Sequence, residues 1–349
     1  MQSNLAHGFD RMHTWLALTH AQTPVEIVSE REIERLDRFK VCYLSGPNLT
    51  RAAVMKLRAW VEAGGTLWLG ADARRAHEFN RPLDTLTSLL PATHGELSTP
   101  EPFQNTGRFL SHLTPRDTVT WGDDKLEVLS VQQSLAARDA ATVLATFSDG
   151  TPAVVSGRAG NGRILLSGFL PALSYIKPAL TARRPLDEQA DEQRRVAEEA
   201  RLKGSQSADQ PEATNAVASA APTSRAATNI PAETRELLER SYNPWQFSDG
   251  IRAKLLTPVR DAQLQPRITC DTPLVDVIAL DCDQGVLLAL SNFSLTPVRE
   301  LRLTLRNAGR FQHVESVRHG LLKFTRTGTT LQLTLPLEAV PLPRRLLLL

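Results

Sequence analysis

Residues 41–71 read VCYLSGPNLTRAAVMKLRAWVEAGGTLWLGA, and this stretch predicts a strand, a helix and a second strand. The two ends, VCYLSG (41–46) and TLWLGA (66–71), are short β-branched or aromatic runs bounded by turn residues, which is typical of buried strands. Thr50 can cap the helix between them, and Gly64-Gly65 can end it. Strands that alternate with helices indicate right-handed crossovers and a parallel sheet covered on both faces.

Further elements are expected on both sides of this unit. An amphipathic helix is predicted over residues 9–19 and a buried strand over VEIVSE (25–30). Strands are also predicted at 118–121, 125–131 and 142–147. PAVVSG (152–157) and RILLSGF (163–169) should form a hairpin, because Asn161-Gly162 between them suits a tight turn. Since a doubly wound domain that opens on a helix is unusual, we expect that its first strand is missing.

The middle of the chain differs in composition from both ends. Residues 176–241 contain no Phe, Trp or Tyr, although the chain has 11, 5 and 3 of these residues. A charged stretch over 183–203, which can form a solvated helix, precedes an Ala/Ser/Thr/Pro-rich stretch that cannot bury enough apolar surface to fold. We therefore expect an α/β domain over 1–182, a flexible and partly helical linker over 183–240, and a second domain over 241–349.

After the linker, apolar residues recur with a period of two. Short strands separated by turns indicate an antiparallel β-sandwich. The predicted strands cover residues 275–282, 285–293, 298–305, 313–317, 321–327, 330–337 and 344–349.

Three stretches resemble a known family. The run VEIVSEREIERLDRFKVCYLSGPNLTRAAVMKLRAWVEAGGTLWLGADARRAHEFNRP (25–82) resembles the class I glutamine-amidotransferase-like, flavodoxin-like domain of family 42 β-galactosidases, often called the trimerisation domain. TVLATFSDGTPAVVSGRAGNGRILLSGFLPALSY (142–175) is similar to the second half of that domain. GVLLALSNFSLTPVRELRLTL (285–305) resembles the small C-terminal β-sandwiches appended to such glycosidases. The resemblance implies a doubly wound parallel sheet followed by a sandwich.

The motifs of catalysis that the resemblance calls for are absent. Class I amidotransferases carry a cysteine nucleophile in a G-x-C-x-G elbow, and a His-x-Glu pair after the final strand. Here the elbow reads Gly70-Ala71-Asp72-Ala73-Arg74, with Asp72 where cysteine is wanted, and residues 168–173 (GFLPAL) contain neither His nor Glu. A glycosidase barrel, which takes about 250 residues, does not fit outside the linker and the β-rich tail. We therefore expect a fold that lacks the family's catalysis, and predict no catalytic residue.

Four residues are candidates for ligand binding. Gly46 and Asn48 follow one central strand and Asp72 follows the next, where doubly wound sheets bind ligands. The favoured alternative is that Gly46 makes a turn while Asn48 and Asp72 cap helices. Trp245 lies with Tyr242 and Phe247 at the exit of the linker, where aromatic rings could stack on a sugar. Anchoring of the returning chain against the first domain is the favoured role there.

Composition and spacing exclude several other functions. The 40 Lys and Arg nearly balance the 38 Asp and Glu, so nucleic-acid binding is not expected. No apolar run suits a membrane span, and no signal peptide is visible, which leaves the cytoplasm as the default location. The eight histidines and the three cysteines lack metal-binding spacing, and no GxGxxG loop is present. We expect free, buried thiols and neither a metal nor a cofactor.

The leading hypothesis is a non-catalytic accessory or assembly module of carbohydrate-related metabolism. Its expected partners are further copies of itself, with a trimer as the family's precedent, or a partner glycosidase chain, and carbohydrate is a candidate ligand. Two alternatives stay open: a hydrolase acting on a glycoside or an amide through a rearranged site near Asp72, and a carbohydrate-binding module that uses Trp245 and Tyr242.

Overall fold

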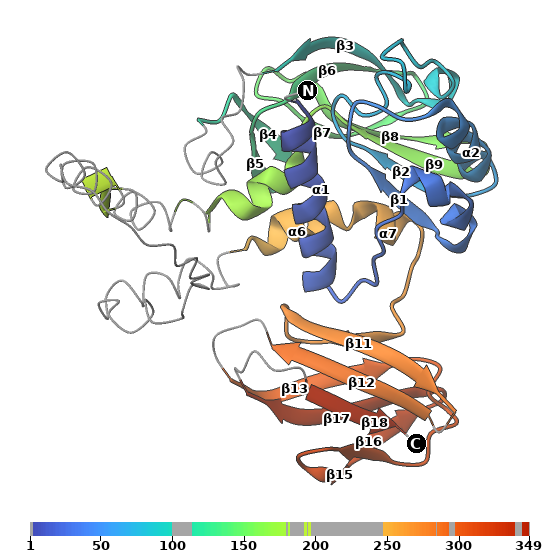
Figure 1. Cartoon of the computed structure of the whole chain (residues 1–349), viewed down its shortest axis with the longest axis vertical. Coiled ribbons are helices and arrows are strands. Elements are labelled where there is room, and N and C mark those ends of the chain that lie inside the picture. Colours follow the sequence, from blue (N-terminus) through green and yellow to red (C-terminus); the bar gives the residue numbers. More distant parts are fainter. Residues whose placement is uncertain are drawn as a thin grey trace, which may run out of the picture.

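The computed structural model describes residues 3–99, 114–178, 181, 192–193, 195–196, 247–283, 285–292, 297–338 and 344–348 of the 349-residue chain. Its helices are α1 (Ser3–His20), α2 (Arg51–Glu62), α6 (Asp249–Leu255) and α7 (Thr257–Asp261), with a further helix over 171–178 and 3-10 helices η1 (Glu30–Arg38) and η2 (Thr87–Leu89). A mixed α/β unit precedes an all-β unit (Figure 1).

A curled seven-stranded sheet forms the centre of the first unit (Figure 1). In spatial order its strands are β1 (Val41–Leu44), β2 (Thr66–Leu69), β9 (Gly162–Ser167), β8 (Pro152–Ala159), β7 (Thr142–Thr146), β4 (Asp117–Trp121) and β5 (Asp124–Val128). Only β1, β2 and β9 run parallel, whereas each later neighbour pairs antiparallel. The prediction of a parallel sheet is therefore right for three strands, and wrong for the others because tight turns join several of them directly.

The strand–helix–strand unit forms as the sequence predicts. Thr50 caps α2 by accepting a hydrogen bond from the backbone N–H of Ala53 at 3.3 Å. Helix α2 covers one face of the parallel strands, and α1 with α6 covers the other. All four residues of β2 are buried, as expected of a strand that lies between two layers. The core under α2 includes Val54, Leu57, Val61, Leu67, Leu69, Ile164 and Leu166. The core on the opposite face includes Ala17, Trp68, Leu165, Ile251 and Leu255.

The predicted hairpin between β8 and β9 is present, and Ala159 pairs with Gly162 across its turn. Gly160 has the left-handed φ of 60° that the turn requires. The end of α2 lies so close to this hairpin that only glycine fits at position 162. A β-carbon there would lie 2.2 Å from the backbone oxygens of both Val61 and Gly65.

Two parts of the first unit differ from expectation. Residues 25–29 form no strand, and the 3-10 helix η1 begins at Glu30, with Ser29 as its cap. Residues 25–29 pair with none of the described strands, and Ile27 is 68% exposed. An unpredicted pair, β3 (Ala92–Ser98) and β6 (Gln132–Ala137), forms a separate two-stranded antiparallel sheet.

The second unit contains two antiparallel sheets. One has the order β10 (Ile268–Cys270), β13 (Val298–Leu305), β17 (Thr330–Leu337), β16 (Phe324–Thr327). The other has the order β11 (Val275–Cys282), β12 (Gly285–Asn292), β18 (Arg344–Leu348), β14 (Val314–Ser316), β15 (Gly320–Leu322). One apolar core includes buried residues of both sheets, among them Leu288, Leu290, Leu303 and Leu333. The single strand expected over 321–327 is instead split between the two sheets.

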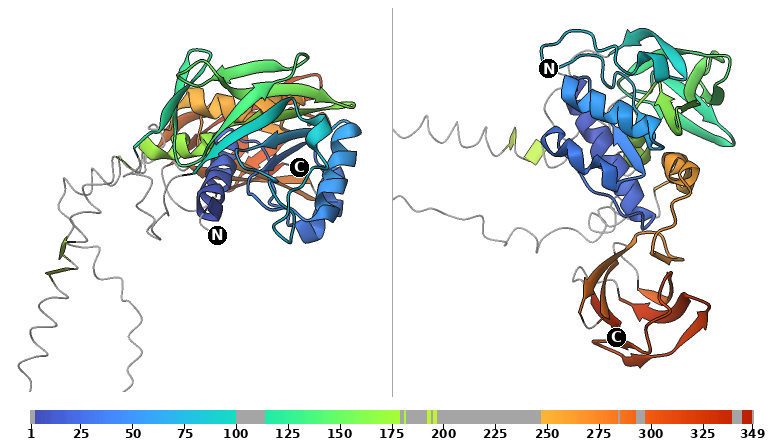
Figure 2. Two further views of the ribbon diagram at one scale, coloured as in Figure 1. Left: turned by 90° about the horizontal axis from the view of Figure 1, so that it is seen from above. Right: turned by 90° about the vertical axis from the view of Figure 1, so that its right-hand side faces the viewer.

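Residues 247–261 pack on the first unit. Helices α6 and α7 lie between the two units in Figure 1, and Ile251 and Leu255 of α6 belong to a core of the first sheet. Figure 2 shows the second unit, coloured orange to red, beyond these helices. The Gln22 side chain bridges the units by donating hydrogen bonds to the carbonyls of Thr272 and Val275 at 3.4 and 3.3 Å.

Candidate functional site

The carboxyl ends of β1, β2 and β9 meet at one edge of the sheet, where the sequence places Gly46, Asn48 and Asp72. Gly46 has a φ of 133°, and its carbonyl accepts a hydrogen bond from the backbone N–H of Arg74 at 3.0 Å. The exposed Asn48 amide donates to Asn80 Oδ1 at 2.8 Å. These two residues therefore hold the loop that follows β1 against the turn that follows β2.

Asp72 lies in a strained turn directly beyond β2. Its φ of 59° is left-handed, and its side chain has 0% exposure. Asp72 Oδ1 lies 3.0 Å from Arg75 Nε in an ion pair, and the Asp72 backbone N–H donates to Gln133 Oε1 at 3.1 Å. Burial raises the pKa of Asp72, and the positive charge of Arg75 and the nearby His7 oppose that rise. The turn thus has a left-handed residue where an elbow would carry its nucleophile, but the Asp72 carboxylate is closed to solvent.

Helix α1 fills the space beyond the strand ends. His7 Nε2 donates a hydrogen bond to the carbonyl of Ala71 at 2.9 Å. The buried Asp10 carboxylate accepts hydrogen bonds from the backbone N–H of Ala172 at 3.1 Å and from the Ser45 hydroxyl at 3.2 Å. Two side chains of α1 thus reach residues that follow β1, β2 and β9. Burial raises the pKa of Asp10 to about 6, although the Ala172 N–H, His7 and Ser45 favour its charged form.

Sequence reasoning missed His7 and Asp10, although one signal points to them. His7, Asp10 and Thr14 recur at i, i+3 and i+7 on α1, and all three are at most 7% exposed. A polar row at helical spacing on a buried face must bond to something in the fold. His7, His13 and His20 lack the spacing of metal ligands, and all three are buried on α1.

Neither Asn48 nor Asp72 caps a helix, so the expected capping role is wrong for both. Thr50 caps α2, and residues 71–74 form a turn after which no helix begins before η2. Trp245 and Tyr242 lie outside the described residues. Their neighbour Phe247 packs against His20 and Tyr175, with ring centroids 4.9 Å away in each case.

A polar cavity of about 340 Å³ lies beside Asp72, and no residue of α1 lines it. It is lined by the turn over residues 72–75, by residues of the loop before β3, and by β3 and β6. Among its lining residues are Arg74, Arg75, Asp84, His94, Gln133 and Arg138. Neither Gly46 nor Asn48 lines it, although the Gly46 carbonyl is bonded to Arg74 of the same turn.

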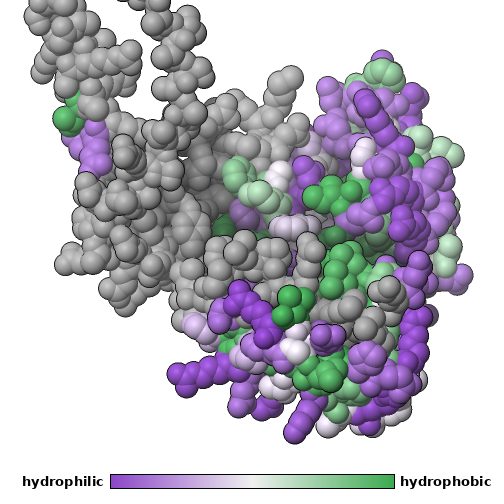
Figure 3. All heavy atoms as spheres, turned by 60° about the horizontal axis from the view of Figure 1, so that its bottom comes forward, coloured by the Kyte–Doolittle hydropathy of each residue, from purple (hydrophilic) through white to green (hydrophobic). Residues whose placement is uncertain are grey.

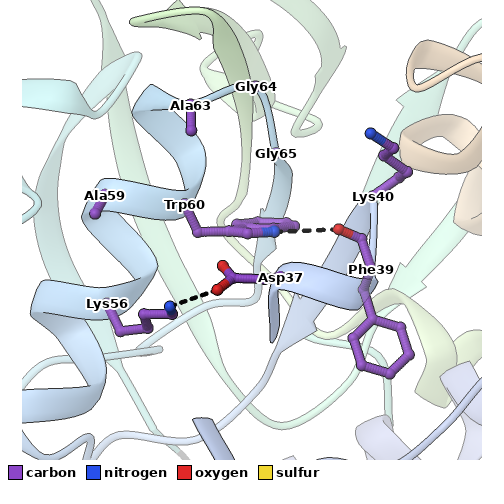
Figure 4. A pocket seen from close by; sticks show the side chains of 9 residues that line it. All are labelled: Asp37, Phe39, Lys40, Lys56, Ala59, Trp60, Ala63, Gly64 and Gly65. Atoms are coloured by element: carbon purple, nitrogen blue, oxygen red, sulfur yellow. Dashed lines mark hydrogen bonds and ion pairs between the residues drawn. The ribbon is translucent and has the colours of Figure 1, made fainter. Parts of the chain in front are cut away.

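A second cavity, of about 400 Å³, lies at the amino ends of β1 and β2 (Figure 4). The Trp60 indole donates a hydrogen bond to the carbonyl of Phe39 at 3.1 Å, and Gly65 packs against its ring. Lys56 pairs with Asp37 at 2.7 Å. These polar groups of the cavity therefore already have partners within the chain. The cavity also lies at the edge of the sheet opposite to the usual ligand position.

The described residues contain no group of three or more His, Cys, Asp or Glu side chains arranged to hold a metal ion. Their cysteines are free, but Cys282 is exposed and Cys42 and Cys270 are half-buried, so the expectation of buried thiols is wrong for Cys282. In the described parts of the chain, every helix is too short or too polar to cross a membrane.

Solved structures with a similar fold include glycoside hydrolases. A β-galactosidase from Rahnella sp. R3 matches with a TM-score of 0.56 and 12% identity, over 97% of this chain and 36% of that one. A β-galactosidase from Bacillus circulans sp. alkalophilus matches with a TM-score of 0.53 and 13% identity, over 97% of this chain and 37% of that one. α-L-Fucosidase isoenzyme 2 from Paenibacillus thiaminolyticus matches with a TM-score of 0.52 and 12% identity, over 97% of this chain and 44% of that one.

These matches show a shared fold. This chain spans little more than a third of the length of the β-galactosidases that it matches. The predicted relation to part of a family 42 β-galactosidase is therefore confirmed at the level of the fold, since a further match is described as a GH42 β-galactosidase. No known protein family matches the sequence, and no curated protein matches it either.

Proposed function

We propose that this chain is a non-catalytic accessory or assembly module of carbohydrate-related metabolism, built from a flavodoxin-like, amidotransferase-like domain and a β-sandwich. The main support for the proposal is that α1 occupies the space beyond the carboxyl ends of β1, β2 and β9. His7 and Asp10 bond to the chain itself where a doubly wound sheet would hold its ligand. The likeness to glycoside hydrolases supports the carbohydrate context, and domain limits at 182 and 240 remain part of the proposal.

Apolar residues on the second unit support an assembly role. Strand β11 is an edge strand, and its Ile278 and Leu280 are 50% and 53% exposed. Figure 3 shows hydrophobic patches among the hydrophilic residues of the face that it presents. A long edge strand with exposed apolar side chains tends to associate with another chain. The partner that we propose is a second copy of this chain, and a glycosidase chain is the alternative.

Substrate turnover tests the absence of catalysis. The purified chain is incubated with a panel of chromogenic glycosides and with glutamine, beside an Asp72→Ala variant. We expect neither protein to turn over any of these substrates. Turnover that the Asp72→Ala substitution abolishes would overturn the proposal.

One observation favours the alternative of a hydrolase. The left-handed backbone of Asp72, three residues beyond β2, is the conformation of a nucleophile elbow, and such strain gathers at functional sites. The zero exposure of the Asp72 side chain opposes this alternative, because a nucleophile must reach its substrate. The carbohydrate-binding alternative rests on Trp245, and glycan binding by Trp245→Ala against the native chain tests it.

A further inference from the structure

The polar cavity beside Asp72 has the size of a small-molecule site. Its volume of about 340 Å³ lies at the lower end of the range of about 300–1,000 Å³ that ligand pockets occupy. Elements far apart in sequence build it: the turn after β2, the loop before β3, and the strands β3 and β6. Helix α1 does not line it, so the filling of the strand ends leaves this cavity open.

The charges around the cavity do not cancel. Arg74, Arg75 and Arg138 line it against two carboxylates, Asp72 and Asp84. Arg75 already pairs with Asp72 at 3.0 Å. Asp84 then balances one of the two remaining arginines, which leaves an excess of one positive charge.

The positive charge of Arg74 is buried, which makes the excess charge unfavourable for the folded chain. The residue is 4% exposed, and its Nη1 donates to the carbonyl of Leu83 at 2.7 Å. Its Nε has no hydrogen-bond partner among the described residues. Burial lowers the pKa of Arg74, and Asp84 only partly opposes that effect. A buried cation without full compensation is stabilised strongly by an anion that binds nearby.

The backbone fixes these arginines in place. Arg74 has a φ of 57°, a second left-handed residue two positions after Asp72. Its N–H is bonded to the carbonyl of Gly46, and the N–H of Asp72 is bonded to Gln133. The ion pair with the buried Asp72 holds Arg75 by its Nε, while the Arg75 side chain stays 57% exposed. Its terminal nitrogens are therefore available to a ligand.

We propose that this cavity binds a monosaccharide-sized organic anion, whose carboxylate or phosphate group accepts hydrogen bonds from Arg75 and is attracted by Arg74. The planar guanidinium fork suits both anionic groups. Thr93, Asp84 and Thr87 line the same cavity and offer partners for hydroxyl groups of the ligand. The site is separate from the proposed assembly surface.

Calorimetric titration of the full chain tests this site. The probes are glucuronate, glucose 6-phosphate and, as the neutral counterpart, glucose. We expect at least one of the anions to bind with a Kd at or below about 1 mM, and glucose to bind at least about tenfold more weakly. The anion that binds more tightly identifies the group as a carboxylate or a phosphate. Equal binding of glucose, or no binding of either anion at about 10 mM, would overturn the proposal.

Two substitutions locate the binding. Arg75→Gln should weaken anion binding at least about tenfold, and Arg75→Lys, which keeps the charge but loses the planar fork, should weaken it by less than Arg75→Gln does. Arg158→Gln is the matched control, because Arg158 is an exposed arginine of β8 that does not line the cavity. Unchanged affinity in a folded Arg75→Gln variant would place the anion elsewhere and contradict the assignment.

Discussion

The carboxylate of Asp10 accepts a hydrogen bond from the backbone N–H of Ala172 at 3.1 Å, which ties α1 to the chain beyond β9. The same carboxylate accepts a second hydrogen bond from Ser45, beyond β1. One buried side chain thus joins the ends of β1 and β9, whose residues Val41 and Arg163 both pair with Thr66 of β2 although 122 positions separate them in sequence. The strand ends become an internal junction, and this closure is the basis of the non-catalytic proposal.

Replacing Asp10 should change how stability depends on pH. The pKa of Asp10 is about 6 in the folded chain, against an ordinary value near 4 when unfolded. Between these values the folded state holds a proton that the unfolded state has lost, so stability from this group falls as pH rises from 4 to 6. Asp10→Asn removes this dependence and should be more stable than the native chain by up to about 3 kcal/mol at pH 7. Urea unfolding from pH 4 to 8 measures it.

The control for this experiment is Asp139→Asn, because Asp139 is exposed in the turn after β6. The buried His13 and His20 also make stability depend on pH in this range, because burial lowers their pKa values to about 4 and about 3, below the ordinary histidine value of about 6.5. They are present in every variant, so the difference between variants isolates Asp10. A difference that stays constant from pH 4 to 8 would contradict the account.

Removing the Phe247 ring should loosen the contact of residues 247–255 with the first unit. Phe247 packs between His20 and Tyr175, and the His20 ring also shares a hydrogen bond of 2.8 Å with the Tyr175 hydroxyl. Phe247→Ala should lower the free energy of unfolding by about 2–4 kcal/mol. Phe79→Ala, at a phenylalanine that is 67% exposed and contacts the Arg51 and His77 side chains at the surface, should change it by less than about 1 kcal/mol. Equal effects of the two substitutions would show that Phe247 is no anchor.

A methyl group at Gly162 should separate α2 from the β8–β9 hairpin. The added β-carbon would lie 2.2 Å from two backbone oxygens, which cannot move without shifting the helix end. We expect Gly162→Ala to cost more than about 3 kcal/mol in thermal or chemical unfolding. Gly8→Ala in α1 meets no atom within 4 Å and should instead stabilise the chain by about 0.5–1 kcal/mol. A mild effect at Gly162 would show that the helix and the hairpin adjust to one another.

A charge on the edge strand β11 should weaken self-association. Leu280 is 53% exposed there, and lysine on an edge strand opposes pairing with a second chain. Leu280→Lys should raise the dissociation constant of the oligomer at least about tenfold in sedimentation velocity. Met55→Lys on α2, where Met55 is 66% exposed, should leave it unchanged. An effect of Met55→Lys alone would place the interface on the first unit.

Local signals in the sequence predict much of this fold. The cap at Thr50, the apolar runs of β1 and β2, and the hairpin of β8 and β9 each depend on signals within a few residues, and each is present as predicted. The hairpin turn is formed by Gly160-Asn161, one residue before the predicted Asn161-Gly162. The prediction of a strand over 25–30 is wrong, because a strand forms only where a second strand lies beside it, and local sequence does not reveal that neighbour. The pairing of β3 with β6 likewise depends on residues about 40 positions apart.

The candidate site was predicted less completely than the fold. Asp72 was found because it directly follows a recognisable strand. His7 and Asp10 were not predicted as site residues, because they lie on α1 and only the tertiary fold brings that helix to the strand ends. Arg74 and Arg75 follow Asp72 in sequence, but their role in a cavity depends on β3 and β6, which were not predicted as a pair.

The most direct test of the central claim is the mass of the purified chain in solution, measured by light scattering during size-exclusion chromatography. If the chain is an assembly module, its mass at micromolar concentration should be that of two or more monomers, and the family resemblance implies three. A mass of one monomer at every concentration would contradict the account.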